Sequence, residues 1–281
     1  IDNVFNKILN RTTKRLNLRM IKKIIFYLKF VTQGTNKYNI HSPLVHNFIE
    51  NVLDSSIKYY AFLGIEHVRE ELKKQKEQIN TKDFGAGSKT IKSSNISIGE
   101  LTKKVQSKSK KAQLLFRLSV FFQKKNILEI GTSLGLTTSY FANTDKRAKV
   151  TTIEADPIIC KWAQKNFNKL KLNNIHLINN SFDEILPDIL KKNFDLIFFD
   201  GNHSKEATLK YFYWALEYVK EESIFIFDDI NWSHEMREAW IEICKCSEVM
   251  LSLDLFSLGI VFFKKNRQKE HINLVHLSNF Y

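Results

Sequence analysis

Several residue types are scarce in this chain, and each scarcity excludes a class of protein. Of 281 residues, 3 are cysteine, 3 are proline and 9 are glycine. So few prolines and glycines exclude a collagen-like repeat and a low-complexity linker. Three cysteines are too few for a disulfide framework, which favours a reducing, cytoplasmic location. No run of 18 apolar residues occurs and the first residues lack the apolar core of a secretory signal, so neither a transmembrane helix nor a leader is predicted.

The residues that are present have a globular composition but an uneven charge. Hydrophobic residues make up 43% of the chain and charged residues 26%, which argues against disorder. The net charge is +13, and residues 1–125 carry 25 basic against 9 acidic residues, so the whole excess lies in the first half. A basic half can meet nucleic acid, an anionic membrane surface or a phosphorylated substrate. It can also be the solvated surface of a lysine-rich protein, and no nucleic-acid-binding motif decides between these alternatives.

The first half of the sequence predicts a helical extension. Residues 4–31 show apolar residues at helical spacing with basic residues opposite, a pattern that suits packing on the same domain or a peripheral membrane contact. Further helices are expected at 46–52, 65–79 and 98–123. The Gly-rich segment from Asp83 to Lys89 follows no apolar strand, so it is interpreted as a connector or a lid and not as a cofactor loop.

From residue 126 the pattern changes to short β-rich runs that alternate with helices. The predicted strands are 126–130, 149–154, 175–179, 194–200 and 223–228, with helices such as 157–170 and 205–219 between them. This alternation is typical of a doubly wound parallel sheet. Runs 248–255 and 258–264 are separated only by a tight turn and predict an antiparallel hairpin. We therefore expect an α/β, Rossmann-like seven-stranded sheet at 111–265, after a helical extension or lid at 1–110 and before a tail at 266–281.

The first strand of this region ends in a glycine-containing turn. The residues are Glu129-Ile-Gly131-Thr132-Ser133-Leu-Gly135. Gly131 can adopt the positive φ of a tight turn, and Gly135 allows a helix and a ligand to approach the backbone. The G-x-x-x-G spacing differs from that of pyrophosphate binders, and the acidic Glu129 disfavours a phosphate. This turn, at the carboxyl end of a parallel strand, predicts a binding crevice for a cationic ligand with hydrogen-bond donors.

The ends of the next two strands offer groups that suit a nucleoside. Glu154 closes the second strand, a little over twenty residues after the first glycine, where a carboxylate can accept both hydroxyl protons of a ribose. Ser181 and Phe182 follow the third strand and can frame an adenine through a hydroxyl or backbone contact and a ring face.

Carboxylates gather at the ends of the fourth and fifth strands. Asp200 begins the sequence Asp-Gly-Asn-His, and Asp228 and Asp229 precede Ile-Asn-Trp. Like charges at adjacent strand ends are costly unless a cation or a proton joins them. Hard oxygen ligands of this kind suit Mg²⁺ or Ca²⁺. The alternative is that Asp229 caps a helix and Asp200 borders the pocket without a metal.

Taken together, these motifs resemble a class I S-adenosylmethionine-dependent methyltransferase over residues 110–265. The pattern is most similar to the metal-dependent bacterial O-methyltransferases of the catechol and caffeoyl-CoA type. The resemblance implies that Glu129 faces the methionine amino group of the cofactor and that Glu154 holds its ribose. The other residues that the resemblance assigns to the cofactor are Gly131, Thr132, Ser133, Gly135, Ser181, Phe182 and Asp200. It also implies a metal at Asp200, Asp228 and Asp229, although the third ligand in that family is an asparagine.

His203 stands three residues after Asp200, where the resembled enzymes have a lysine base. A histidine, whose unperturbed pKa is about 6.5, can remove a hydroxyl proton at neutral pH, so Asp200 and His203 are the candidate catalytic residues. Trp232 and His234 are expected to wall the acceptor pocket. Cys244-x-Cys246 lacks partners for zinc and is interpreted as a packed helix end.

The sequence thus predicts a methyltransferase that uses S-adenosylmethionine to methylate a hydroxyl of a small molecule. Two alternatives stay open: a methyltransferase of RNA or another macromolecule that the basic half anchors, and a non-catalytic protein that kept the fold. The strand-four end lacks the N/D-P-P-[YFW] signature of base-amine methylation, which counts against the first. The combination of Gly131, Gly135 and Glu154 counts against the second. A homodimer is also left open.

Overall fold

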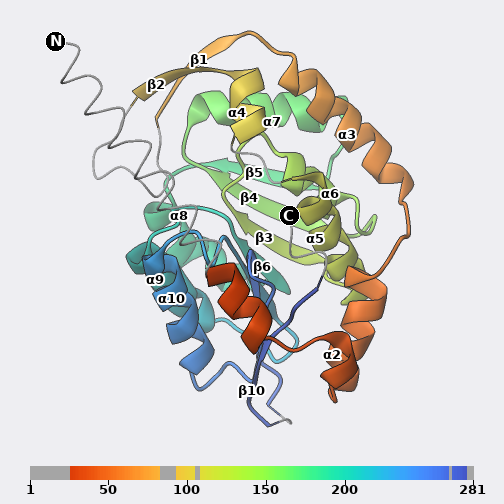
Figure 1. Ribbon diagram of the computed structural model, residues 1–281. Coiled ribbons are helices and arrows are strands. Elements are labelled where there is room, and N and C mark those ends of the chain that lie inside the picture. The colour runs from red at the N-terminus through yellow and green to blue at the C-terminus, as the bar shows by residue number, and fades with distance from the viewer. Residues whose placement is uncertain (1–25, 83–92, 105–107, 266–267, 277–281) are drawn as a thin grey trace, which may run out of the picture.

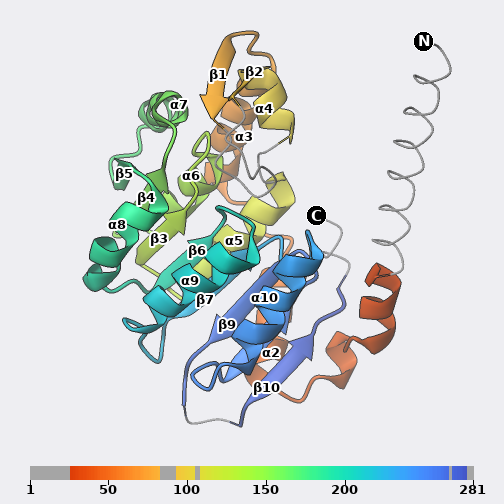
Figure 2. The ribbon, with the colours of Figure 1, turned by 90° about the vertical axis from the view of Figure 1, so that its left-hand side faces the viewer.

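The computed structural model describes residues 26–82, 93–104, 108–265 and 268–276. An eight-stranded sheet carries helices on both faces, and a two-stranded hairpin stands beside it (Figures 1 and 2). The strands are β1 (Gln78–Lys82), β2 (Ser93–Ser97), β3 (Asn126–Ile130), β4 (Lys149–Glu154), β5 (Ile175–Asn179), β6 (Leu196–Phe199), β7 (Ile224–Asp228), β8 (Leu251–Asp254), β9 (Leu258–Phe262) and β10 (Glu270–Asn273). No helix among the described ranges is long and apolar enough to cross a membrane.

The helices lie mainly in the connections between the strands. Helix 26–33 is followed by η1 (Lys37–Asn39), α2 (Pro43–Phe48), η2 (Ile49–Leu53), α3 (Tyr60–Lys73), α4 (Ile98–Lys104), α5 (Ser109–Phe121), α6 (Leu136–Ala142), α7 (Pro157–Lys169), α8 (Phe182–Ile189), η3 (Leu190–Lys192), α9 (Lys205–Leu216) and α10 (His234–Lys245). The start of α7 shows how the sequence sets such a boundary. Asp156 accepts hydrogen bonds from the N–H groups of Ile158 and Ile159, and Pro157 occupies the first turn, where no N–H is needed.

The order of strands across the main sheet is β10-β8-β9-β7-β6-β3-β4-β5. Strand β3 pairs in parallel with β4 on one side and with β6 on the other, so the order reverses at β3. Strands β8 and β9 form an antiparallel hairpin, and β9 pairs antiparallel with β7. In open parallel sheets a ligand binds beyond the carboxyl ends of the strands at such a reversal. The turns after β3 and β6 are therefore the expected walls of a site.

Alternation along the strands builds a core on each face of the sheet. Ile127 of β3 belongs to a cluster with α5 and α6, whereas its neighbour Leu128 belongs to a cluster with α8, α9 and α10. Successive side chains of a strand point to opposite faces, and strands covered on both faces are apolar throughout. Figure 1 shows α9 and α10 on one side of the sheet and α5 and α6 on the other.

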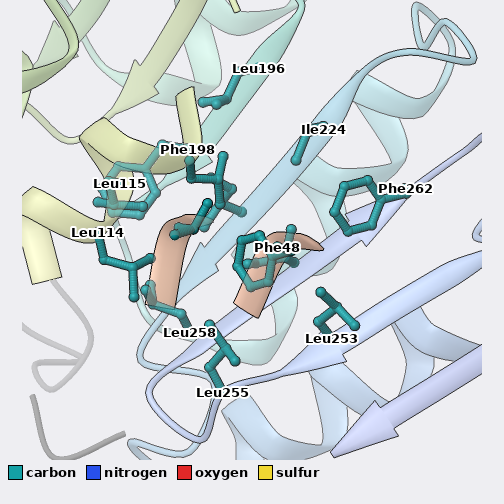
Figure 3. Close-up of a cluster of buried hydrophobic side chains, with 14 of the residues drawn as sticks. Phe48, Leu114, Leu115, Leu196, Phe198, Ile224, Leu253, Leu255, Leu258 and Phe262 are labelled. Atoms are coloured by element: carbon teal, nitrogen blue, oxygen red, sulfur yellow. The ribbon is translucent and has the colours of Figure 1, made fainter. Parts of the chain in front are cut away.

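The N-terminal helices share the core of the sheet. Phe48, at the end of α2, is fully buried and lies among side chains of α5 and of strands β6 to β9 (Figure 3). Arg117 of α5 donates to the carbonyl of Val52 at 2.8 Å. A third cluster joins α3, α4, α6 and α7 and includes Ile79 of the β1–β2 hairpin. The region before residue 110 thus packs against the sheet through α2 and η2, and against helices α5, α6 and α7 through α3, α4 and β1.

The two ends of the described chain meet at the outer edge of the sheet. Thr35 pairs with Leu274 in a parallel bridge, and its N–H donates to the carbonyl of Asn273 at 2.7 Å. Nearby, Asp54 contacts the ring of His276 at 2.7 Å and Lys37 at 3.0 Å.

The predicted fold class is confirmed, and three details differ. The main sheet has eight strands, because β10 pairs in parallel with β8 inside the segment that the sequence predicts as a tail. The helix predicted at 65–79 ends at Lys73, and Gln78 already begins β1. The helix predicted to end at residue 31 extends to residue 33, and the structure describes its residues 26–33. The remainder of that helix and the segment from Asp83 to Lys89 lie outside the described residues.

Candidate active site

The turn after β3 is joined to the end of β4. The N–H groups of Gly131 and Thr132 both donate to the carbonyl of Ile153 at 3.1 Å. The N–H of Ser133 donates to Oε2 of Glu154 at 2.9 Å. The structure therefore brings the glycine turn and the acidic strand end, which are 21 residues apart in sequence, into direct contact.

Both glycines of the turn have positive φ, and each has a neighbour that leaves no room for a side chain. Gly131 has φ +107°, and a Cβ there would lie 2.4 Å from the carbonyl oxygen of Asp200. Gly135 has φ +76°, and its Cβ would lie 2.4 Å from a ring carbon of Phe167 in α7. The first glycine therefore lets the turns after β3 and β6 approach each other, and the second lets α6 pack on α7.

Glu129 is a fully buried carboxylate with one oxygen unsatisfied. Its Oε2 accepts hydrogen bonds from the hydroxyls of Thr138 and Thr152, the second at 2.7 Å. Its Oε1 is buried without a hydrogen-bond partner. Burial raises the pKa of Glu129 to about 8, against the lowering effect of the two threonines. Leaving a buried acceptor unpaired costs about 1–3 kcal/mol, so a donor from a ligand would be stabilised here.

Glu154 is held by backbone donors on both oxygens. Besides Ser133, the N–H of Asp156 donates to its Oε1 at 3.0 Å. Burial raises the pKa of Glu154, and the hydrogen bonds from Asp156 and Ser133 oppose that rise. These bonds fix the orientation of the carboxylate, while each oxygen keeps a second lone pair for a hydroxyl donor.

The residues predicted to frame an adenine lie at the start of α8. Ser181 is the N-cap residue of that helix and Phe182 is its first residue. The ring of Phe182 packs edge-on against Tyr211, with centroids 6.0 Å apart. It also covers Gly201, where a Cβ would lie 2.5 Å from the ring. Phe182 thus adjoins the turn after β6, next to Asp200.

Asp200 and His203 lie together beyond β6, as the sequence predicts. Oδ1 of Asp200 and Nε2 of His203 are 3.8 Å apart, and both side chains are about one-fifth exposed. Burial raises the pKa of Asp200 well above its usual value, and the nearby Asp228 raises it further, against the opposing charge of Lys111. The pair lies directly beyond β6 and is partly exposed, so solvent can reach it.

Lys111, a residue that the sequence analysis does not select, lies among the carboxylates. Its Nζ donates to both carboxylate oxygens of Asp228 at 2.7 Å and is 3.7 Å from Oδ1 of Asp229. Burial alone would lower the pKa of Lys111, but Asp228, Asp229 and Asp200 outweigh it and raise the pKa above its ordinary value. Lys111 and Asp228 are 117 residues apart in sequence and Lys111 belongs to a predicted helix, so no local pattern reveals the pair.

The backbone is strained at three turns that surround this region. Ser133, Asn202 and Asp229 adopt positive φ of 47°, 48° and 52°, and they follow β3, β6 and β7 respectively. Such conformations cost about 1–3 kcal/mol for residues other than glycine and concentrate at functional sites. All three turns leave the same edge of the sheet, so this edge is the best candidate for the active site.

The remaining predicted pocket residues are more exposed. Trp232 is 45% exposed, and its backbone N–H donates to the backbone carbonyl of Asp229 at 2.8 Å. The side chain of His234 is 88% exposed and pairs with Glu238. Trp232 is therefore positioned at the rim of the site, whereas His234 faces solvent. Cys244 and Cys246 pack at the end of α10 beside the second core cluster.

Comparisons with known proteins match this part of the chain. A family model described as "Methyltransferase domain" matches residues 128–230. A catechol O-methyltransferase of Niastella koreensis is 32% identical over 123 residues, which are 42% of this chain and 53% of that protein. The chain thus spans about half the length of this curated relative.

Solved structures are similar to this chain at the level of the fold. An O-methyltransferase from Bacillus cereus in complex with SAH (S-adenosylhomocysteine) is 19% identical, with a TM-score of 0.52 over 78% of this chain and 97% of that one. An SAH-bound methyltransferase from Podospora anserina is 15% identical, with a TM-score of 0.56 over 80% and 97%. The chain is therefore similar in sequence to a methyltransferase domain over residues 128–230, and similar in fold to methyltransferases that bind SAH.

Proposed function

We propose that this protein transfers a methyl group from S-adenosylmethionine to a hydroxyl of a small molecule. The observation that carries the proposal is the joined arrangement of the turn after β3, the carboxylate of Glu154 and the unsatisfied oxygen of Glu129. These neighbouring groups would offer donors and acceptors for both ends of an amino-acid nucleoside. The curated relative, a catechol O-methyltransferase, supports a hydroxyl acceptor.

The carboxylates of Glu129 and Glu154 fit this cofactor. Glu129 would receive the amino group, because its free oxygen lacks a donor. Glu154 would receive the ribose hydroxyls, and Gly131 with its neighbours Thr132 and Ser133 would line the turn. Gly135 would support that turn through α6, and Ser181, Phe182 and Asp200 would border the adenosine. When bound, the cofactor supplies an electrophilic methyl group on a sulfonium.

We expect Glu154→Ala to weaken SAH binding by about 10- to 100-fold, since hydrogen bonds to a charged group contribute about 1.5–3 kcal/mol each. Isothermal titration calorimetry measures the affinity. Glu184→Ala is the control, because Glu184 lies in the first turn of α8 and is exposed. No heat from the parent protein would end the cofactor proposal, and parental affinity in Glu154→Ala would remove Glu154 from the site.

On the acceptor side, the proposed role of the chain is alignment and proton removal. Methyl transfer is an in-line displacement, so most of its acceleration comes from holding the two reactants in line. His203 would take the hydroxyl proton, and Asp200, whose Oδ1 lies 3.8 Å from Nε2 of His203, would border the acceptor beside it. Trp232 would form the rim of the acceptor pocket.

Replacing His203 by alanine is expected to lower kcat by about 10²–10⁴-fold, the usual contribution of a general base. The SAH affinity should stay at its parental value. Initial rates with radiolabelled S-adenosylmethionine and catechol as the probe acceptor measure the effect. His234→Ala is the matched control, because that histidine is 88% exposed and pairs only locally with Glu238. An unchanged rate in His203→Ala would exclude it as the base.

The three predicted metal ligands do not fit Mg²⁺ or Ca²⁺ as they are placed. In the described part of the chain, no three His, Cys, Asp or Glu side chains are grouped so that they could hold a metal ion. Lys111 engages both oxygens of Asp228, which a metal would need. No step of the proposed reaction is therefore assigned to a metal.

The N-terminal region, residues 1–110, is proposed to complete the acceptor pocket and to select the substrate. Thr81, in β1, donates a hydrogen bond to Asp156 at 2.7 Å, two residues beyond Glu154. This contact brings the β1–β2 hairpin beside the proposed ribose site. A screen of cell-extract fractions with radiolabelled methyl donor, with and without nuclease, would identify the acceptor. Loss of labelled product on nuclease treatment would instead favour an RNA acceptor.

A further inference from the structure

The carboxylates at the ends of β6 and β7 lie around a positively charged side chain of the same protein, the ammonium of Lys111. The ammonium of Lys111 lies 2.7 Å from each oxygen of Asp228, and Oδ1 of Asp229 is 3.7 Å away. The N–H of Asp229 also donates to Oδ1 of Asp228 at 2.8 Å. Both oxygens of Asp228 are thus engaged, and its side chain is 3% exposed.

The fold brings Lys111 to this place. It lies in the first turns of α5 next to the fully buried Ala112, and its side chain is 10% exposed. Leu114 and Leu115 anchor the same helix in the core beneath the sheet. A lysine on the buried side of a helix is stable only when its charge is paired, and Asp228 supplies that pair.

A divalent ion at this position would compete directly with Lys111. It would need the oxygens that the ammonium occupies, and it would lie within a few ångströms of a positive charge that is not exposed to water. Like charges so close are strongly unfavourable in a site of low dielectric. The ammonium has three N–H donors and Asp228 accepts at two oxygens, so Asp228 alone does not use all three donors.

We propose that Lys111 is the resident cation of this site, and that it takes the position at which the sequence predicts a divalent metal. In this protein the ammonium would neutralise Asp228 and Asp229 and position the acceptor oxygen beside Asp200 and His203. The positioning of the acceptor oxygen rests on the proposed methyltransferase function, whereas the role of Lys111 as the cation of the site does not. Lys111 is a positioning residue in this proposal, and proton removal stays with His203.

Manganese binding tests the proposal without an acceptor. Titration of free Mn²⁺, followed by electron paramagnetic resonance, should show no stoichiometric site on the parent protein. In Lys111→Ala the side chains of Asp228 and Asp229 lose the ammonium that holds them apart from a common ion, so they can turn toward Asp200. This variant should bind one equivalent of Mn²⁺, about 10- to 100-fold more tightly than any weak binding by the parent, the range by which neighbouring groups change the affinity of a metal site. Lys111→Ala combined with Asp228→Asn should lose this binding. Lys124→Ala is the matched control, because Lys124 is also buried but donates to the carbonyl of Glu222.

Thermal unfolding gives a second readout. The Tm of Lys111→Ala should fall in EDTA and recover on addition of Mn²⁺, whereas the Tm of the parent should not respond to either. Lys111→Met, which keeps the length of the side chain, replaces the alanine variant if that protein does not fold. Stoichiometric Mn²⁺ binding by the parent that Asp228→Asn abolishes would overturn the proposal, as would a folded Lys111 variant that binds no Mn²⁺. Calorimetry with SAH on the same proteins tests the methyltransferase function separately.

Discussion

Replacing Gly131 by alanine is expected to abolish SAH binding and to lower the free energy of unfolding by about 2–4 kcal/mol, the combined cost of a strained φ and an overpacked contact. The new Cβ would lie 2.4 Å from the carbonyl oxygen of Asp200. Neither strand end can move away freely, because the N–H of Asp200 donates to Ile130 at 2.9 Å and the N–H of Gly131 donates to Ile153 at 3.1 Å. The turn after β3 would therefore have to open.

Chemical denaturation and calorimetry measure these two effects in the same protein. Gly64→Ala is the matched control: a Cβ there lies 3.6 Å from Leu170, an ordinary contact, and Gly64 is inside α3. That variant should keep the parental SAH affinity, and its free energy of unfolding should rise by about 0.5–1 kcal/mol, because alanine is favoured over glycine within a helix. If Gly131→Ala bound SAH with parental affinity, the turn would not be part of the cofactor site.

Glu129 is expected to give the second large effect, a release of protons when SAH binds. Burial raises its pKa from the ordinary 4.5 to about 8, so the side chain is mainly protonated in the free protein at pH 7. A positively charged amino group at the unsatisfied Oε1 would stabilise the ionised form, and the proton would leave on binding. Calorimetry in buffers of different ionisation enthalpy counts the released protons. Glu129→Gln should abolish the release and weaken binding by about 10- to 100-fold.

The same raised pKa fixes the sign of the pH dependence of stability. Between pH 4.5 and about 8 the folded protein holds a proton that the unfolded chain loses, so this group lowers the stability as the pH rises through that range. Glu129→Gln should remove this contribution. Glu66→Gln is the control, because Glu66 also accepts from two hydroxyls, those of Ser109 and Tyr140, but belongs to α3. Equal proton release by the parent and by Glu129→Gln would contradict the assignment.

The sequence predicts the strands from β3 to β5 well because apolar residues recur along each of them. Strands β3, β4 and β5 begin and end at the predicted residues, since apolar runs end there at glycine or polar residues. It misses β10, an edge strand whose residues Glu270 and His271 are exposed. It also extends the charged helix to residue 79, because Gln78–Lys82 carries no apolar alternation beyond the buried Ile79.

The candidate site was predictable wherever it depends on strand ends. Glu129, Glu154, Asp200 and Asp228 all lie at one edge of the sheet because parallel strands end together. The sequence does not predict that a side chain of a distant helix pairs with one of these carboxylates. The pairing of Lys111 with Asp228 depends on how α5 crosses the sheet, and that angle is set by packing over the whole core.

The bridge between Thr35 and Leu274 has a consequence for how the molecule can be handled. Its hydrogen bonds, with the contacts of Asp54 to Lys37 and His276, fasten the beginning of the described chain to its end. They also occupy backbone groups that an edge strand would otherwise offer to a neighbouring molecule. Removing the residues of either terminus that form these contacts would leave the other terminus without its partner and the backbone groups of the edge strand unpaired. A shortened version of the protein would therefore be prone to self-association.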